Sequence, residues 1–259
     1  MSFVICMVPA APLRKEEAHR SEMISQILFG ELAEVLEEGK QFTRIRCQYD
    51  GYEGWCQTSQ LAEIDPAIVH TNSTLIAAEW GNLAVINGQP MHLSLGTSLG
   101  VFTHNKVQVG DWQIAYLGKT WDSRSAVFAE DEIRGLAIQF INTPYLWGGR
   151  STFGIDCSGF VQQLFRFFNI RLPRDAYQQV EEGEVVGFLQ EAVCGDLAFF
   201  DNEEGKITHV GLLFSSDTII HAAGKVRIDR IDNMGIINTD TGERTHRLRV
   251  VKRYMPGPF

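Results

Sequence analysis

The sequence has no excess of positive charge and no long hydrophobic run. Its 23 Lys and Arg residues are outnumbered by 32 Asp and Glu residues, which gives a formal net charge of −9. Nonspecific binding to nucleic acid or to an anionic membrane requires clustered Lys and Arg, so this balance argues against both kinds of partner. No stretch approaches the roughly 20 apolar residues of a membrane-spanning helix.

The usual parts of a secretory signal are also missing. Residues 1–9 contain an apolar run, but no basic segment precedes the run and no small-residue cleavage site of the usual kind follows it. We therefore interpret residues 1–9 as an edge strand. We expect a soluble protein of the cytoplasm, or of the cell envelope if a leader has been removed.

Cysteine is scarce and irregularly spaced. An odd number of cysteines without a repeating interval is present, namely Cys6, Cys47, Cys56, Cys157 and Cys194. Reduced thiols are the default for an intracellular chain, and we expect them here. Cys47 and Cys56 flank a predicted turn, which leaves a disulfide between them as a minor alternative.

The length of 259 residues exceeds that of a usual single domain, and the first quarter looks all-β. Apolar and polar residues alternate over 41–47, a turn is expected at Asp50-Gly51, and a second strand follows at 54–56. This pattern predicts a hairpin. We place the end of this first domain at residue 65.

Residues 66–124 carry short apolar runs separated by Gly or Asn, at 84–86, 101–102 and 112–117. Such runs predict short strands, although they are less regular than those before residue 65. We interpret this region as a second small all-β domain. No internal repeat is clear enough to prove a duplication.

Residues 125–259 form the third predicted domain, where the composition changes to that of helices followed by strands. Helix-forming residues cover 125–142 and stop before Pro144. A second helix is expected to begin at Cys157. Strand candidates follow at 196–200, 208–214, 218–222 and 247–254. Helices first and an antiparallel sheet after them predict an α+β domain.

Cys157 is a candidate nucleophile because of its place on the second helix. Asp156 suits the capping position, and Cys157 shares the apolar face that continues through Phe160 and Leu164. The unpaired N–H groups and dipole of a helix start favour a thiolate. The alternative is a small buried hydrophobe, which is the commoner fate of a free cysteine.

A cysteine nucleophile needs a base and a group that orients the base. Of the seven histidines, His209 and His221 lie on the two strands that follow the helix, whereas His246 lies near the last strand. If 215–217 is a three-residue loop that pairs Phe214 with Thr218, residue 211 pairs with 221 and both histidines share one face. The opposite face would then be apolar. A structural histidine remains the alternative for each.

These motifs resemble a known family. Asp156-Cys157-Ser158-Gly159, His209-Val210-Gly211 and His221, preceded by the loop 145–149, are similar to the motifs of the NlpC/P60 family of papain-like cysteine peptidases, over residues 125–259. Residues 1–65, with Gly54-Trp55, resemble a bacterial SH3 domain, and 66–124 would be a second, divergent SH3-like barrel. SH3-like domains in front of such a catalytic domain resemble the γ-D-glutamyl-L-diamino acid endopeptidases.

The resemblance implies a division of roles without a metal or cofactor. Cys157 would be the nucleophile, His209 the base and then the acid, and His221 the group that holds His209. The Tyr145 hydroxyl would donate to the oxyanion, with the Cys157 backbone N–H as another candidate.

The substrate implied by the resemblance is a free murein tripeptide or tetrapeptide with an N-terminal L-Ala. Cleavage after γ-D-Glu would release L-Ala-γ-D-Glu during recycling of wall peptides. Asp175 matches the acid that binds the free amine, although Ala176 replaces the family's usual Ser. The other implied substrate-binding residues are Glu22 and Tyr52 of the first domain, and Trp147, Asp156 and Ser158. Glu22 and Tyr52 could equally be surface side chains, and Asp156 could be only a helix cap.

Three alternatives remain at the level of sequence. The chain could be a non-catalytic protein that binds wall peptides, or a papain-like hydrolase of another amide or ester. A zinc site made of Cys157, Cys194, His209 and His221 is the third, but their separations match no usual zinc spacing.

Overall fold

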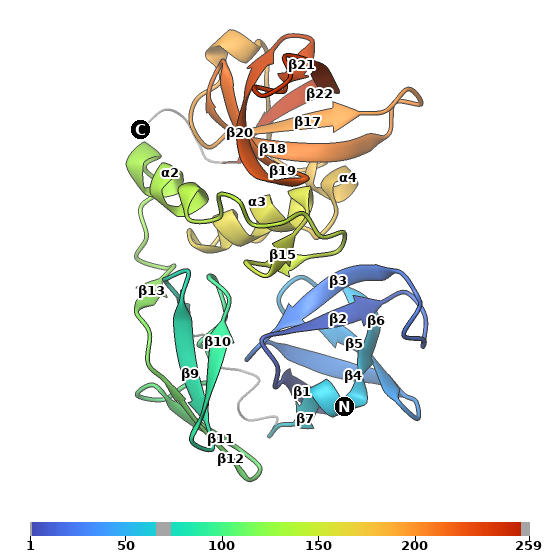
Figure 1. Ribbon diagram of the computed structural model, residues 1–259, viewed down its shortest axis with the longest axis vertical. Coiled ribbons are helices and arrows are strands. Elements are labelled where there is room, and N and C mark those ends of the chain that lie inside the picture. The colour runs from blue at the N-terminus through green and yellow to red at the C-terminus, as the bar shows by residue number, and fades with distance from the viewer. Residues whose placement is uncertain (1, 66–73, 255–259) are drawn as a thin grey trace.

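A computed structural model describes residues 2–65 and 74–254. Three bodies are visible: the third region lies above, and the first and middle regions lie side by side beneath it (Figure 1). The boundary predicted near residue 66 lies outside the described residues. Within the described part of the chain, no helix is long and apolar enough to cross a membrane.

The first region is one antiparallel sheet in the order β3-β2-β6-β5-β4-β1-β7. Its strands are β1 (Phe3–Cys6), β2 (Ala10–Arg14), β3 (Met23–Leu28), β4 (Leu32–Glu38), β5 (Phe42–Cys47), β6 (Glu53–Gln57) and β7 (Leu61–Glu63). The predicted hairpin is confirmed, because β5 pairs with β6 with Arg46 opposite Glu53. The prediction of an edge strand at 1–9 is wrong. β1 lies between β4 and β7, where Val4, Ile5 and Cys6 are buried.

The middle region contains a four-stranded sheet in the order β10-β9-β12-β11 and a separate pair, β13-β8. Its strands are β8 (Leu75–Ala77), β9 (Asn82–Ile86), β10 (Gln89–Leu93), β11 (Lys106–Val109), β12 (Trp112–Tyr116) and β13 (Thr120–Asp122). The strands predicted at 84–86 and 112–117 are confirmed as β9 and β12. No strand forms at 101–102. Val101 instead packs with Ile5 and Phe29 of the first region in one shared core.

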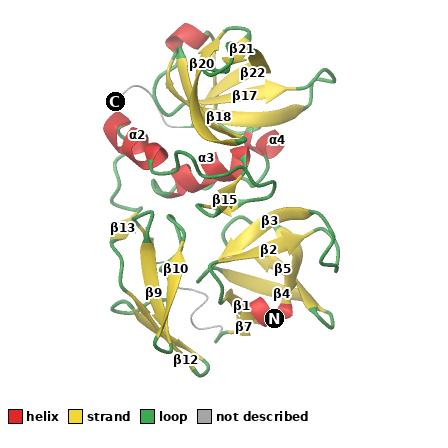
Figure 2. Ribbon diagram, in the orientation of Figure 1, coloured by secondary structure: helices red, strands yellow, loops and turns green. Residues whose placement is uncertain are grey.

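The third region joins helices to a seven-stranded sheet in the order β16-β22-β17-β18-β19-β20-β21. Its helices are α2 (Glu130–Ile138), α3 (Cys157–Arg166) and α4 (Ala176–Gln179). Its strands are the pair β14 (Arg150–Ser151) and β15 (Gly154–Ile155), then β16 (Glu184–Val186), β17 (Leu197–Asp201), β18 (Ile207–Ser215), β19 (Thr218–Ala223), β20 (Lys225–Asp232), β21 (Gly235–Ile237) and β22 (Arg244–Arg253). Helix α3 lies between this sheet and the other two regions (Figures 1 and 2).

The first predicted helix is shorter than expected. It spans Glu130–Ile138 rather than 125–142, and Val127, which the pattern places on the buried face, is 71% exposed. The backbone turns instead at residues 122–125, where the Ser125 N–H donates to the Asp122 carbonyl. The acidic first turn, Glu130 to Glu132, marks the true start of the helix.

The hairpin that carries the two histidines has the predicted register but a different turn. Gly211 lies opposite His221, yet Ser215, not Phe214, lies opposite Thr218, and a bulge falls between Leu213 and Ser215. The bulge adds one residue and so restores the register that a three-residue loop would have given. The opposite face is apolar as predicted, since Val210, Leu212 and Ile220 share a core with the residues of α3.

Candidate active site

Cys157 is the first residue of α3, and the helix start holds it in place. The Asp156 carboxylate accepts from the backbone N–H of Gly159 at 2.7 Å and from that of Gly148 at 2.8 Å. This is the cap expected from the sequence. Cys157 is only 6% exposed. The N–H of Val210, the residue after His209, lies near enough to the sulfur to lower the pKa of the thiol.

The thiol is nevertheless kept in its neutral form. Burial raises the pKa of Cys157 to about 12 and the nearby Asp156 carboxylate adds to the rise, against smaller opposing effects of the Val210 and Ser158 N–H groups and of Arg174. The prediction that the helix start makes a thiolate is therefore wrong for the resting protein. Desolvation outweighs the dipole, so ionisation requires a base that takes the proton.

The two histidines form a hydrogen-bonded series with a carboxylate that the sequence analysis missed. His209 Nε2 lies 2.8 Å from His221 Nδ1, and His221 Nε2 lies 2.9 Å from Asp229 Oδ2. Asp229 also accepts two bonds from Arg227, at 2.7 and 2.8 Å, and one from the Thr239 N–H. Despite burial, the bonds from His221 and Arg227 hold the pKa of Asp229 well below its usual range.

This series fixes which nitrogen of His209 can act as a base. An ionised Asp229 only accepts, so His221 must donate from Nε2 and keeps a lone pair on Nδ1. His209 then donates from Nε2 to that lone pair, which leaves its own Nδ1 unprotonated. Burial holds the pKa of His209 well below its ordinary value, and His221 lowers it further, so the ring is neutral at pH 7.

The position of Asp229 could have been predicted from the geometry of the hairpin formed by β19 and β20. The turn at Gly224 pairs His221 with Arg227 and Ile219 with Asp229, so alternate residues of β20 face the histidines. His246 was set aside at the level of sequence, yet it stacks on His209 with ring centroids 4.1 Å apart. β22 brings it there by pairing with β17, the strand next to the one that carries His209. Burial lowers the pKa of His246 to about 4.

The side chains of Asp156 and Ser158 both accept hydrogen bonds from Arg174 of the same protein. Arg174, 1% exposed, donates to both oxygens of Asp156, at 3.0 and 2.6 Å, and to the Ser158 hydroxyl at 2.9 Å. The same guanidinium donates to Ser25 Oγ of β3 at 3.1 Å. Arg174 thus fixes the start of α3 against the first region, a role that the sequence analysis missed.

Asp175 and Tyr52 meet although they come from different regions. The Tyr52 hydroxyl donates to Asp175 Oδ2 at 3.1 Å, and a further bond links Asp175 to Tyr177. Burial raises the pKa of Asp175 above its usual value, against the effect of the neighbouring Arg174. A half-buried carboxylate held by hydroxyl groups keeps acceptor capacity for a cation.

The remaining predicted residues lie on the loop before α3 and beside it. Trp147 is 61% exposed, and its ring N–H donates to Glu22 Oε1 at 3.0 Å, which joins this loop to the first region. Burial raises the pKa of Tyr145, and the nearby Cys157 sulfur and Asp156 add to the rise. The Tyr145 side chain therefore stays a neutral donor near the sulfur.

All five cysteines are free thiols. Burial raises the pKa of Cys194 to about 11, and its charged neighbours, Arg134 and Glu130, belong to α2. Over residues 2–65 and 74–254, no group of three or more His, Cys, Asp or Glu is arranged to hold a metal ion.

Comparison with known proteins gives two family matches. Residues 142–245 match the NlpC/P60 family, and residues 13–61 match the bacterial dipeptidyl-peptidase Sh3 domain. The chain is 34% identical over 216 residues to the γ-D-glutamyl-L-lysine dipeptidyl-peptidase of Bacillus subtilis strain 168, covering 76% of this chain and 71% of the relative.

Two further similarities extend over most of the chain. Dipeptidyl-peptidase 6 of Lysinibacillus sphaericus is 25% identical, covering 89% of this chain and 92% of the relative. The crystal structure of an NlpC/P60 family protein from Bacillus cereus superposes with a TM-score of 0.83 and 21% identity, covering 98% of this chain and all of the other. That structural likeness shows a shared fold that includes all three regions.

Proposed function

The chain belongs to the NlpC/P60 family of cysteine peptidases, and from this premise we propose that it hydrolyses the bond between γ-D-Glu and the diamino acid in free peptides of peptidoglycan. The proposed substrate is a tripeptide or tetrapeptide with an unblocked N-terminal L-Ala, and the proposed product is L-Ala-γ-D-Glu. The observation that supports the proposal is the hydrogen bond between Tyr52 and Asp175, because it orients a half-buried carboxylate that could receive an amine. Asp175 follows Arg174, which binds Asp156 and Ser158 at the start of α3.

Acylation begins with a proton transfer. The proton passes from the Cys157 sulfur to His209 Nδ1 as the sulfur attacks the amide carbonyl. The C–N bond then breaks, and His209 returns the proton to the leaving amine of the diamino acid. A thioester on Cys157 remains. His221 and Asp229 hold the ring so that the same nitrogen faces the reaction throughout.

Deacylation uses the same nitrogen in the opposite order. Water gives a proton to His209 Nδ1 while its oxygen attacks the thioester carbonyl. The C–S bond breaks, the sulfur takes the proton back, and the dipeptide leaves with a free carboxylate. In both steps the Tyr145 hydroxyl and the Cys157 backbone N–H donate to the oxyanion.

Recognition of the amine is assigned to Asp175. A substrate ammonium would replace water around a carboxylate that two tyrosine hydroxyls already orient, and a charge-assisted bond of this kind is stronger than a neutral one. Trp147 of the third region and Glu22 of the first region are joined by a hydrogen bond, and the two side chains would form the wall of the substrate site next to Asp175. An acylated amine has no positive charge and adds bulk, so the site should reject it.

The proposal also covers the cellular role of the enzyme and the nature of the middle region. We propose a role in the recycling of wall peptides in the cytoplasm, since a requirement for a free amine restricts the enzyme to released peptides. We also propose that the middle region is a divergent SH3-like domain. Its short antiparallel strands support this reading, and its shared core with the first region gives it a scaffolding role.

The test compares L-Ala-γ-D-Glu-L-Lys with its N-acetylated form. We expect release of L-Ala-γ-D-Glu from the first peptide and at least about 100-fold lower kcat/KM for the second, since about 2.7 kcal/mol of charge-assisted bonding is lost. Equal cleavage of both peptides would remove the proposed amine specificity. If correctly folded protein cleaved neither peptide, the proposed substrate would be wrong.

A further inference from the structure

Tyr52 lies on the loop 48–52 between β5 and β6, and its hydroxyl reaches Asp175 in the third region. The start of this loop is attached to the third region, because the guanidinium of Arg166 lies 4.3 Å from the centre of the Tyr49 ring. That contact is made by the residue at position 49, so it does not by itself place the Tyr52 hydroxyl. A second attachment is found closer to Tyr52.

Asp50 joins Tyr52 to helix α3. Its Oδ1 accepts from the Tyr52 backbone N–H at 3.1 Å, and its Oδ2 accepts from the side-chain amide of Gln162 at 3.1 Å. Gln162 is fully buried and belongs to α3, the helix that begins at Cys157. One carboxylate therefore holds the end of the loop against the helix that carries the nucleophile.

The side chain of Gln162 is fixed in one orientation. Its Oε1 accepts from Arg150 Nε at 2.8 Å, and its Nε2 also donates to the Leu172 carbonyl at 3.0 Å. Turning the amide over would set its oxygen against the Leu172 carbonyl and its NH2 group against the Arg150 N–H. Gln162 therefore presents a donor to Asp50 and requires an acceptor there.

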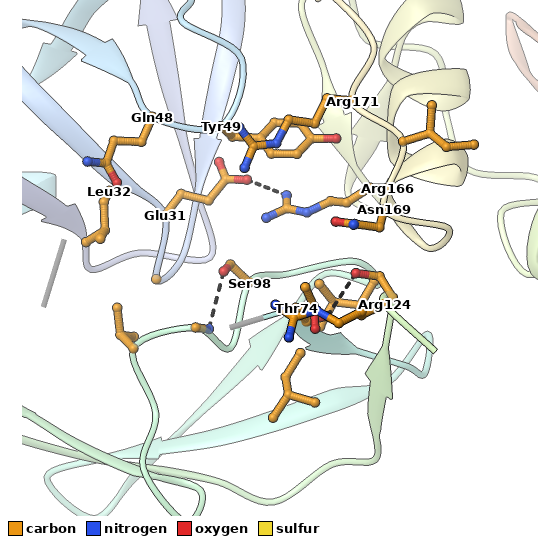
Figure 3. Close-up of a pocket in the computed structure, with 17 residues that line it drawn as sticks. Glu31, Leu32, Gln48, Tyr49, Thr74, Ser98, Arg124, Arg166, Asn169 and Arg171 are labelled. Carbon is orange, nitrogen blue, oxygen red and sulfur yellow. Dashed lines mark hydrogen bonds and ion pairs between the residues drawn. The ribbon is translucent and has the colours of Figure 1, made fainter. Parts of the chain in front are cut away.

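The arginine that orients Gln162 is itself held between two regions. Arg150 is fully buried and donates to Glu31 of the first region at 3.2 Å. Glu31 also bonds to Arg166 of α3, as Figure 3 shows. Despite burial, Glu31 and Asp50 hold the pKa of Arg150 above its ordinary value, so the guanidinium stays charged. The same contacts that join the regions thus set the orientation of Gln162.

Both bonds to Asp50 require a carboxylate, which offers two acceptor oxygens. An amide at this position offers one acceptor and would set an NH2 group against that of Gln162. We propose that Asp50 is a positioning residue for recognition of the substrate amine, and that it acts through Tyr52. This inference rests on the proposed function, because it concerns the same amine site. Asp50 holds the Tyr52 hydroxyl at Asp175 and acts without touching the substrate.

The test variant is Asp50→Asn in the full-length protein. The asparagine oxygen can still accept from the Tyr52 N–H, so the turn is kept while the bond to Gln162 is lost. We expect KM for L-Ala-γ-D-Glu-L-Lys to rise about 2- to 10-fold at nearly constant kcat. Glu53→Gln is the matched control. It removes the same charge from the same hairpin, at a surface ion pair, and should leave KM unchanged.

A double-mutant cycle with Tyr52→Phe tests whether Asp50 acts through Tyr52. In that background, Asp50→Asn should raise KM little further, because the hydroxyl that it positions is absent. Additive rises in KM would overturn the proposal, as would an unchanged KM in Asp50→Asn alone. Either result would leave intact the preference of the native protein for the free peptide over the N-acetylated one.

A crystal structure of Asp50→Asn gives a second measurement that does not depend on the substrate. The Tyr52 hydroxyl should lie beyond hydrogen-bond reach of Asp175, and a retained contact would overturn the positioning role. Equal cleavage of the free and N-acetylated peptides by the native protein, together with loss of this contact in the variant, would refute the proposed function while Asp50 still positioned Tyr52.

Discussion

The reacting groups and the recognition groups are built in different ways. His209, His221 and Asp229 lie on three successive strands joined by tight turns, within one sheet. Tyr52 and Asp175 are 123 positions apart and meet only because two regions pack together. The reaction machinery therefore depends on local hairpin register, whereas recognition depends on docking. Changes in the sheet should alter kcat, and changes at the docking surface should alter KM.

The largest effect is expected for Cys157→Ala, which should abolish turnover and leave binding of the substrate intact. Turnover should fall by about 10⁴-fold or more, because Cys157 is the nucleophile of the proposed mechanism. Binding of the tripeptide, measured by calorimetry, should persist. Cys194→Ala is the matched control and should retain activity. Equal turnover by Cys157→Ala would exclude the thiol mechanism.

Asp229→Asn tests the part of the site that is built on the sheet. The amide can donate as well as accept, so the series no longer imposes one tautomer on His221 and His209. We expect kcat to fall by about 10² to 10⁴-fold with little change in KM.

The pH profile separates this positioning role from simple loss of stability. Removal of the Asp229 charge should move the acidic limb of kcat to lower pH, since a negative charge favours the protonated imidazole. Asp232→Asn removes a carboxylate of the same strand that pairs with Arg244 away from the histidines, and it should leave kcat and its pH profile unchanged. A uniform loss at all pH values in both variants would contradict the positioning role.

Asp175→Asn tests the recognition side. Loss of a charge-assisted bond to the ammonium, about 1.5–3 kcal/mol, should raise KM for the free peptide by roughly 10- to 100-fold at nearly constant kcat. The N-acetylated peptide should be cleaved as slowly as before. If kcat fell instead, the carboxylate would act in the reaction and the division between the two regions would be wrong.

A smaller change in the same direction is expected for Tyr52→Phe. The substitution removes one hydrogen bond to Asp175 and keeps the ring, so KM should rise about 2- to 10-fold. Because Tyr52 belongs to the first region, this variant tests whether docking controls recognition. An unchanged KM at unchanged stability would mean that the first region contributes nothing through this contact.

The smallest effect concerns stability at acid pH. His246 has a folded pKa of about 4 and an unfolded value near 6.5, so the unfolded chain binds more protons between these values. The free energy of unfolding should therefore fall as pH drops from about 6.5 to 4. His246→Phe keeps an aromatic ring beside His209 and should show a shallower fall in urea titrations. An equally steep fall would assign the effect to other groups, His209 first.

Much of the site could be predicted because its signals are local. A cap followed by an apolar helical face placed Cys157, and the period of two along strands placed His209 and His221 on one face. The bulge at Phe214 escaped prediction, yet it left the register unchanged. Asp229 was within reach of the same reasoning, had the pairing been continued through Gly224.

The groups that could not be predicted are those fixed by distant parts of the chain. Arg174 bonds to Ser25, and His246 reaches His209 through the pairing of β22 with β17. The resting charge of Cys157 was misjudged for a related reason. A helix start favours a thiolate, but the degree of burial, which decided the outcome, depends on the packing of the whole third region.

The central claim is that reaction and recognition are separable, and one paired measurement tests it directly. It is the ratio of kcat/KM for free and N-acetylated L-Ala-γ-D-Glu-L-Lys in Asp229→Asn and in Asp175→Asn. We predict that Asp229→Asn loses rate on both peptides and keeps the native ratio, while Asp175→Asn brings the ratio close to one. A native ratio in Asp175→Asn, or a collapsed ratio in Asp229→Asn, would contradict the account.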